Sequence, residues 1–171
     1  MDIFYEANEK FLKRNLGDIK RGISERSMCA NLKEETSIII RKSDYSMYFV
    51  DVEYNRNAER IKTILISNEI IDITSDFLIH ARGTQKHENI LALEMKKSTA
   101  TKKEKDDDRA RIKALTMSEE QVYKMGGGLP VSTVCGYLIG IYYEIDILSE
   151  IITMEYYSNG SKVYSENNSF E

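Results

Sequence analysis

Residues 89–98 read NILALEMKKS, and this stretch decides the fold that the sequence predicts. Its length, its apolar first half and the polar residues on both sides are typical of one β-strand. Side chains alternate between the two faces of a strand, so Glu94 and Lys96 share one face with Ala92, while Leu91, Leu93 and Met95 share the other. A carboxylate and an ammonium group therefore lie side by side on a strand that is otherwise apolar.

A second predicted strand precedes this one and carries another carboxylate. The segment 72–81 contains Asp76, followed directly by the apolar run of residues 77–79. Arg82-Gly83 and the polar residues after them predict a hairpin loop, so we expect the two strands to pair in antiparallel fashion. In that pairing Asp76 can lie beside Glu94.

Two helices are predicted upstream of these strands. Apolar residues at helical spacing predict a first helix over residues 2–14, which Gly17 ends. A second helix follows over residues 18–35, capped by its first residue. Glu25 falls in the middle of the apolar stripe of this second helix. An interior acid is rare unless it is paired, so Glu25 either pairs with Arg21, one turn earlier, or belongs to a site.

The rest of the chain predicts further strands and one more helix. Apart from the two strands above, the predicted strands are 38–40, 47–54, 61–66, 135–145 and 150–157, and a helix spans 108–116. We expect polar loops at 55–60 and at the glycine triplet 126–128, and a turn at Asn159-Gly160. The last ten residues are expected to be frayed or a weak edge strand. The order predicts a mixed α/β domain.

Composition limits the class of protein. A chain of 171 residues, 42% of them apolar and eleven of them tyrosine, is not a disordered chain. We expect one domain over residues 1–171, with an N-terminal helix (1–17), a core (18–157) and a polar tail (158–171). Two cysteines are too few for a disulfide scaffold, and neither a signal-peptide pattern nor a membrane-length apolar run occurs. We therefore expect no membrane partner and a cytoplasmic location.

Charge is distributed unevenly along the chain. The net charge of −4 argues against binding of nucleic acid by the whole surface. Residues 10–26, however, carry six cations against two carboxylates, and residues 96–113 carry eight cations against four. The two segments could together form a surface that faces phosphates, or they could be ordinary solvated faces.

Adjacent carboxylates on neighbouring strands point to a metal ion. Two carboxylates about 4 Å apart repel each other by about 4 kcal/mol at an effective dielectric constant of about 20, so both stay ionised only with a cation between them. A hard divalent ion held by one or two carboxylates and several waters is typical of Mg²⁺ or Mn²⁺. A lysine at the same place could orient a water molecule whose pKa the metal lowers. Such a site suits hydrolysis of a phosphodiester.

Asp76, followed by Glu94-Met95-Lys96, resembles the PD-(D/E)xK motif of the restriction-endonuclease-like nucleases. Ser75 stands where that family often has proline. The predicted elements over about residues 20–145 are also similar to the family in order. The resemblance implies an α/β fold with a restriction-endonuclease-like core, a mixed β-sheet flanked by helices. The implied order is α-β-β-β-α-β, with an N-terminal helix and a C-terminal strand added.

The resemblance further implies a Mg²⁺- or Mn²⁺-dependent nuclease and assigns its residues. Asp76 and Glu94 would hold the metal, with the backbone carbonyl of Met95 as a further ligand. Lys96 would act on the attacking water. Glu25 would be a supplementary ligand or an acid that supports the others.

Several alternatives stay open at this point. Lys97 is a second candidate for the role of Lys96, although it points to the opposite face of the strand, and Glu94 with Lys96 could be a surface pair on an edge strand. The expected partner is nucleic acid, with DNA favoured, and the chain could act as a homodimer or as a subunit of a larger defence or mobile-element system. The alternative function is a non-catalytic module that binds nucleic acid or protein with the same fold.

Overall fold

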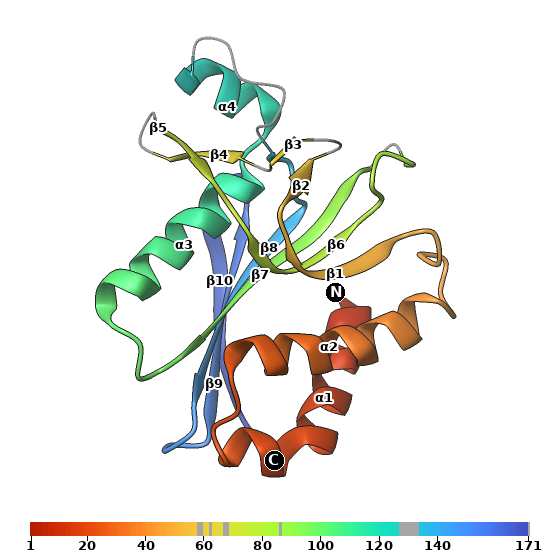
Figure 1. The fold of residues 1–171 in the computed structure, drawn as a ribbon, viewed down its shortest axis with the longest axis vertical. Coiled ribbons are helices and arrows are strands. Elements are labelled where there is room, and N and C mark those ends of the chain that lie inside the picture. Colours follow the sequence, from red (N-terminus) through yellow and green to blue (C-terminus); the bar gives the residue numbers. More distant parts are fainter. Residues whose placement is uncertain (58–59, 62, 67–68, 86, 127–133, 171) are drawn as a thin grey trace.

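The computed structural model describes residues 1–57, 60–61, 63–66, 69–85, 87–126 and 134–170. A six-stranded mixed sheet lies at its centre, so the chain is an α/β protein as expected (Figure 1). The sheet consists of β1 (Phe49–Tyr54), β6 (Ser75–His80), β7 (Asn89–Lys97), β8 (Ile139–Asp146), β9 (Ile151–Ser158) and β10 (Ser161–Ser169), in that spatial order.

This sheet contains antiparallel strand pairs and one parallel pair, which is joined by a crossover connection. Strands β1, β6 and β7 pair in antiparallel fashion, which confirms the pairing predicted for the strands that carry Asp76 and Glu94. Strands β7 and β8 are parallel, and the chain between them contains α3 (Lys102–Thr116) and α4 (Glu119–Gly126). A parallel pair needs such a crossover connection. Strands β8, β9 and β10 then pair in antiparallel fashion.

Helix α1 (Asp2–Lys20) is longer than the sequence predicts. We expected Gly17 to end it, but the helix continues for three more residues. Ile19, beyond the glycine, is fully buried. Glycine in a helix costs only about 1 kcal/mol relative to alanine, and burial of one isoleucine outweighs that cost.

Helix α2 (Glu25–Ile40) begins and ends later than predicted. Its cap is Ser24, whose hydroxyl accepts a hydrogen bond from the Ser27 amide, and not the residue at position 18. Residues 38–40, predicted as a strand because they are β-branched, form the last turn of this helix. Ile40 is buried there, so tertiary packing overrides the strand preference.

Helix α3 begins six residues before its predicted start at Asp108. Thr101 and Glu104 form a capping box, in which the Thr101 hydroxyl accepts from the Glu104 amide and the Glu104 carboxylate accepts from the Thr101 amide. The charged residues 102–107, which the predicted helix left out, therefore belong to the helix. Asp108 consequently lies inside α3, where it is buried.

Between β1 and β6, short strands occupy part of the predicted polar loop 55–60, and β4 covers residues 63–66 of the strand predicted at 61–66. These strands are β2 (Arg56–Asn57), β3 (Arg60–Ile61), β4 (Thr63–Ile66) and β5 (Glu69–Asp72), which form two hairpins. Positions 127 and 128 of the predicted glycine loop lie outside the described residues.

The C-terminal region differs from its prediction in extent. The strand predicted from residue 135 begins only at Ile139. Asn159 and Gly160 have positive φ and form the expected turn, and the segment after it is the edge strand β10. Of the two alternatives expected for the last ten residues, frayed or an edge strand, the structure has the edge strand.

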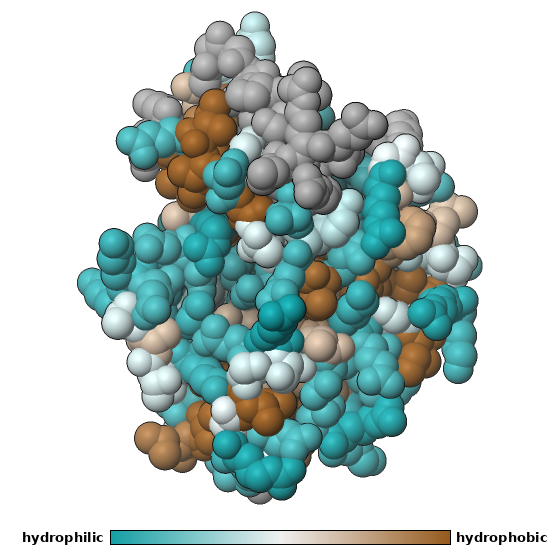
Figure 2. All heavy atoms as spheres, in the orientation of Figure 1, coloured by the Kyte–Doolittle hydropathy of each residue, from teal (hydrophilic) through white to brown (hydrophobic). Residues whose placement is uncertain are grey.

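Helices cover both faces of the sheet. Side chains of α1 and α2 pack on the face that carries Leu91, Leu93 and Met95, and α3 packs on the opposite face against Ala92 and Tyr142. In the view of Figure 2, hydrophilic side chains cover most of the surface on which α2 and α3 lie. None of the helices in the described part of the chain is both long and apolar enough to cross a membrane.

A buried acid joins β1 to β6. Asp51 lies 2.9 Å from Nε2 of His80 and accepts a hydrogen bond of 3.0 Å from Nε of Arg82. Burial by itself would raise the pKa of Asp51, but the hydrogen bonds from His80 and Arg82, together with the charge of Arg82, lower it to about 2. The folded-state pKa is thus below the value of about 3.9 in an unfolded chain.

We expect this acid to make stability depend on pH. Its contribution of about 1–2 kcal/mol is complete above about pH 4 and is lost as the pH falls towards 2. Replacing Asp51 with asparagine should therefore lower the free energy of unfolding at pH 7 by this amount, and the deficit should shrink between pH 4 and 2. Urea unfolding across this range measures it, with exposed Asp44→Asn as the control. A deficit that is the same at every pH would contradict the assignment.

Candidate functional site

The start of β6 and the second half of β7 bring Asp76 and Glu94 together. The last residue pair of the β6–β7 ladder is Phe77 with Leu93, and Asp76 and Glu94 are the next residues on the two strands. Beyond the ladder, Oδ2 of Asp76 accepts a hydrogen bond of 2.9 Å from the Met95 amide. The Met95 amide lies beyond the last paired residues of β6 and β7, and the Asp76 carboxylate supplies the hydrogen-bond acceptor that this amide needs.

Glu94 is a fully buried carboxylate with one oxygen free. The side chain of Arg111 reaches Oε2 of Glu94 with Nη2 at 3.0 Å and Nε at 3.2 Å. The other oxygen, Oε1, is buried and has no hydrogen-bond partner among the described residues. Burial raises the pKa of Glu94 well above its usual range, Asp76 raises it further, and Arg111 acts in the opposite direction.

The pKa of Asp76 is raised as well. Burial raises its pKa to about 6, helped by the charge of Asp108 and opposed by the Met95 hydrogen bond and by the charges of Lys96 and Arg111. Two neighbouring acids with raised pKa values are expected where carboxylates lie together without enough positive charge between them. The pair therefore has capacity for a further cation.

Lys96 projects to the same face and stays charged. Its Nζ lies 3.1 Å from Oδ2 of Asp108 and 3.3 Å from Oε2 of Glu25. Burial by itself would lower the pKa of Lys96, but these two carboxylates raise it. The Nζ of Lys97 instead donates to the carbonyl of Gly22. Among the contacts of the described residues, the side chain of Lys96 meets acids of this site, whereas Lys97 meets Glu25 only through its backbone amide.

Glu25 reaches the site from a different position than predicted. It is the first residue of α2, and its side chain is 31% exposed, so it does not lie in the middle of an apolar stripe. Arg21, the partner that the sequence allowed, pairs with Asp18. The Glu25 carboxylate accepts a hydrogen bond of 2.8 Å from the Lys97 amide and faces Lys96.

Helix α3 contributes two residues that the sequence did not single out. Asp108 is 2% exposed, and Arg111 lies one turn later on the same face of the helix. Their positions share the helical stripe of Ile112 and Leu115, which pack against the sheet. With the helix start placed correctly, this spacing would have shown both charges facing the sheet.

The donors available are oxygens, which is the ligand type of Mg²⁺ and Mn²⁺. No group of three or more His, Cys, Asp or Glu side chains in the described part of the chain is arranged to hold a metal ion. Mg²⁺, however, commonly uses one or two carboxylates and keeps several waters. Asp76 and the unpartnered Oε1 of Glu94 fit that smaller requirement.

The N-terminal basic segment is balanced within the protein. Five of its six cations form ion pairs, namely Lys10–Glu6, Arg14–Glu35, Lys20–Glu150, Arg21–Asp18 and Arg26–Glu53. Exposed ion pairs of this kind are ordinary solvated surface. In the second basic segment, Lys102 and Lys103 are exposed at the start of α3, the helix that carries Arg111.

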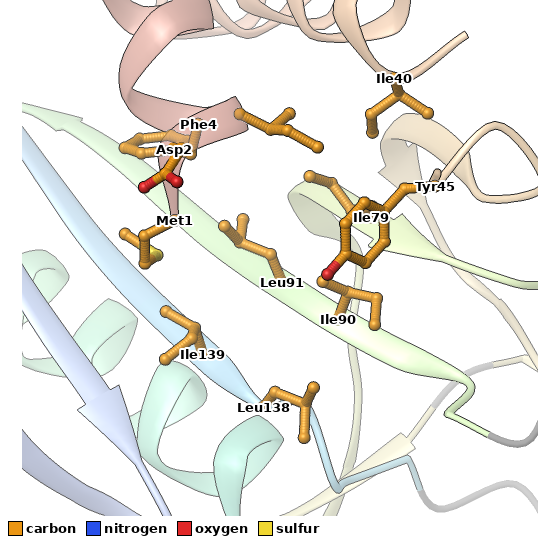
Figure 3. Close-up of a pocket in the computed structure, with 11 residues that line it drawn as sticks. Met1, Asp2, Phe4, Ile40, Tyr45, Ile79, Ile90, Leu91, Leu138 and Ile139 are labelled. Carbon is orange, nitrogen blue, oxygen red and sulfur yellow. The ribbon is translucent and has the colours of Figure 1, made fainter. Parts of the chain in front are cut away.

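An apolar cavity lies on the other face of the sheet. It has a volume of about 300 Å³ and lies between the start of α1, the end of α2 and the strands (Figure 3). Its floor includes Phe4, Ile79 and Leu91, which are all buried. None of the residues predicted for the site lines this cavity, so the cavity is separate from the site around Asp76 and Glu94.

Comparison of the chain with protein-family models found no match, and comparison with curated proteins and with solved structures found none. The function is therefore inferred from the geometry of the acidic cluster. This cluster is defined as Glu25, Asp76, Glu94, Lys96, Asp108 and Arg111.

Proposed function

We propose that the protein is a metal-dependent nuclease with a restriction-endonuclease-like core. The observation that carries the proposal is a pair of neighbouring acids on adjacent strands, the partly buried Asp76 and the fully buried Glu94, with Lys96 on the same face. The element order supports the core as well: α2, β1, β6, β7, α3 and β8 follow the sequence α-β-β-β-α-β, with the short strands β2–β5 inserted after β1 and α4 inserted after α3. Helix α1 and strands β9 and β10 are additions to it.

Some residues of the acidic cluster would hold a divalent ion, and another would act on the water. Asp76 and Oε1 of Glu94 would hold Mg²⁺ or Mn²⁺, with the backbone carbonyl of Met95 as a further ligand. When bound, the ion would lower the pKa of a water molecule and neutralise charge that develops on the phosphate. Lys96, fixed between Asp108 and Glu25, would donate a hydrogen bond to the attacking water or to a phosphate oxygen.

The substrate would approach from the partly exposed side of the cluster. The side chains of Glu25, Lys96 and Arg111 are 31%, 17% and 28% exposed, whereas Glu94 and Asp108 are covered. This arrangement favours an extended polyanion that reaches the site from outside over a ligand that is enclosed. Nucleic acid, with DNA as the favoured polymer, fits this requirement, and Lys102 and Lys103 could contact its backbone.

One observation favours the second candidate, a module that binds nucleic acid or protein without cleaving it. The guanidinium of Arg111 already neutralises part of the charge of Glu94. A buried carboxylate that is paired with arginine can be stable without a metal. In this case Mn²⁺ would not bind, and Lys96→Ala would leave the binding activity unchanged.

Cleavage assays with and without metal separate the two candidates. Duplex DNA, single-stranded DNA and RNA would each be incubated with the protein in Mg²⁺, Mn²⁺ or EDTA. We expect cutting of at least one polymer with metal and none in EDTA. Binding of a polymer with no cutting of any, and no heat of Mn²⁺ binding in calorimetry, would instead establish the non-catalytic module.

Glu25 provides a further prediction. Replacing Glu25 with alanine removes the contacts with Lys96 and the Lys97 amide, so we expect cleavage and Mn²⁺ affinity to fall about tenfold. The control is Glu34→Ala, an exposed acid on the same helix. Glu25→Ala with wild-type cleavage and a lower melting temperature would show that Glu25 only anchors α2 to β7.

A further inference from the structure

Two charged residues of α3 belong to the acidic cluster. They contact the glutamate that is proposed to hold the metal and the lysine that is proposed to act on the water. Asp108 and Arg111 are one helical turn apart and form an ion pair with each other. Asp108 is almost completely buried, and the side chain of Arg111 is 28% exposed. Burial of this extent is rare for charged side chains unless each one is paired, so their partners define what they do.

Arg111 binds only one of the two oxygens of Glu94. Its Nη2 and Nε lie 3.0 Å and 3.2 Å from Oε2. The oxygen Oε1 has no hydrogen-bond partner among the described residues, although it is buried. Both donors of the guanidinium meet the same oxygen, so the charge-assisted contact occupies Oε2 and leaves Oε1 unoccupied. Arg111 thus determines which oxygen of Glu94 stays available.

Asp108 links the two cations of the cluster. Its Oδ2 lies 3.1 Å from Nζ of Lys96, and its Oδ1 contacts Nη2 of Arg111. One carboxylate on the helix therefore anchors both a strand lysine and a helix arginine. Loss of this carboxylate would release both cations at once.

The charges of the cluster leave room for one divalent ion. Glu25, Asp76, Glu94 and Asp108 carry four negative charges when ionised, and Lys96 and Arg111 carry two positive charges. One divalent cation balances the remainder with Arg111 still in place. Displacement of Arg111 from Glu94 is therefore not needed for charge balance.

We infer that Asp108 and Arg111 are positioning residues of the metal site. Arg111 holds Oε2 of Glu94 so that Oε1 is presented to the cation, and Asp108 fixes both Arg111 and Lys96. This inference rests on the proposed nuclease function and adds to it a single-ion site whose geometry is set by α3. It is tested by metal binding alone and then by kinetics.

Calorimetric titration of Mn²⁺ into the protein without nucleic acid is the first experiment. We expect one ion per chain in the wild type and affinity ten- to a hundredfold weaker in Arg111→Met, the loss typical when a group that orients a ligand is removed. Arg111→Lys should restore part of the affinity, because lysine keeps the charge but not the contact of both guanidinium donors with Oε2. The control is Arg109→Met on the same helix, because Arg109 contacts Glu155 and has no contact with Glu94.

Each result decides between interpretations. Affinity in Arg111→Met equal to or above that of the wild type overturns the inference, and the second case would show that Arg111 competes with the ion. Binding of two ions per wild-type chain would overturn the single-ion site that the charge count predicts. If circular dichroism shows that Arg111→Met is unfolded, Arg111→Lys decides, and wild-type affinity in that variant overturns the inference. A wild type that binds no Mn²⁺ overturns the proposed function itself, and the inference with it.

Enzyme kinetics test whether Asp108 positions Lys96 and Arg111. With saturating Mn²⁺, Asp108→Asn should lower kcat about tenfold and leave KM for the polymer unchanged, because Lys96 and Arg111 lose a shared anchor that does not contact substrate. Asp107→Asn, an exposed acid at the neighbouring position, is the control. An unchanged kcat in Asp108→Asn would overturn its positioning role.

Discussion

Glu94→Gln is expected to reduce metal-dependent cleavage on the order of a thousandfold, the scale on which a preorganised electrostatic group contributes to catalysis. Glutamine has nearly the same shape and can still accept from Arg111 at its carbonyl oxygen. It cannot supply the negative charge that a divalent cation requires at Oε1. Asp76→Asn should have the same effect, because the asparagine carbonyl can still accept from the Met95 amide while the charge is lost.

The same substitutions should leave the metal-free protein at least as stable as the wild type. Burial raises the pKa of Asp76 to about 6, so ionising it in the folded protein costs free energy. Because its folded-state pKa is above that of an unfolded aspartate, the wild type loses stability as the pH rises from about 4 to 6. Asparagine does not titrate, so in EDTA at pH 8 we expect Asp76→Asn to be more stable by about 2 kcal/mol.

Two measurements check this pair of effects. Cleavage rates of the two variants and the wild type are compared in Mn²⁺, and melting temperatures are compared in EDTA at pH 5 and pH 8. The exposed acid variant Asp107→Asn should match the wild type in both. Wild-type cleavage by either Glu94→Gln or Asp76→Asn would show that the acidic cluster is not where hydrolysis takes place.

The central acids could be predicted from sequence because their placement depends on local rules. Alternation along β7 puts Glu94 and Lys96 on one face, and the short connection to β6 makes the two strands antiparallel. Both rules act over a few residues. The relation of Asp76 to Glu94 therefore needed no knowledge of the remaining fold.

The contributions of the helices could not be predicted in the same way. The charged run before Asp108 resembles a connector, and the capping box at Thr101 and Glu104 that starts α3 was missed. The predicted helix therefore begins at Asp108, and Arg111, although it lies inside the predicted helix, was not recognised on the face of Ile112 and Leu115. Glu25 was selected for a wrong reason: the cap at Ser24 makes it the first residue of α2, and only tertiary packing brings it to Lys96.

Helix α3 also depends on a glycine in the strand beneath it. A Cβ atom at Gly140 of β8 would lie 2.6 Å from Cγ2 of Ile112 and 2.7 Å from Cγ2 of Thr116. Both of these residues are buried in α3, so neither can move aside easily. Gly140 thus sets how closely α3, and with it Asp108 and Arg111, approaches the sheet.

We expect Gly140→Ala to lower the free energy of unfolding by about 1–3 kcal/mol and Gly140→Val by more, the cost typical of overpacking a core. Urea unfolding measures the loss. Gly17→Ala is the matched control, because a Cβ there meets only Nη1 of Arg21, at an ordinary 3.7 Å, and alanine favours the helix. Gly17→Ala should therefore be neutral or stabilising.

A double-mutant cycle can assign this loss to the contact with α3. Thr116→Ser removes the methyl group that Gly140→Ala would meet but keeps the hydroxyl that donates to the Ile112 carbonyl. The double variant should therefore be less destabilised than the sum of the two single variants, by about 0.5–1 kcal/mol. Strict additivity would mean that the Thr116 methyl group does not oppose the added Cβ, which would leave the contact with Ile112 as the cause of the loss. In that case the depth at which Arg111 meets Glu94 would have to be set by the contact with Ile112 instead.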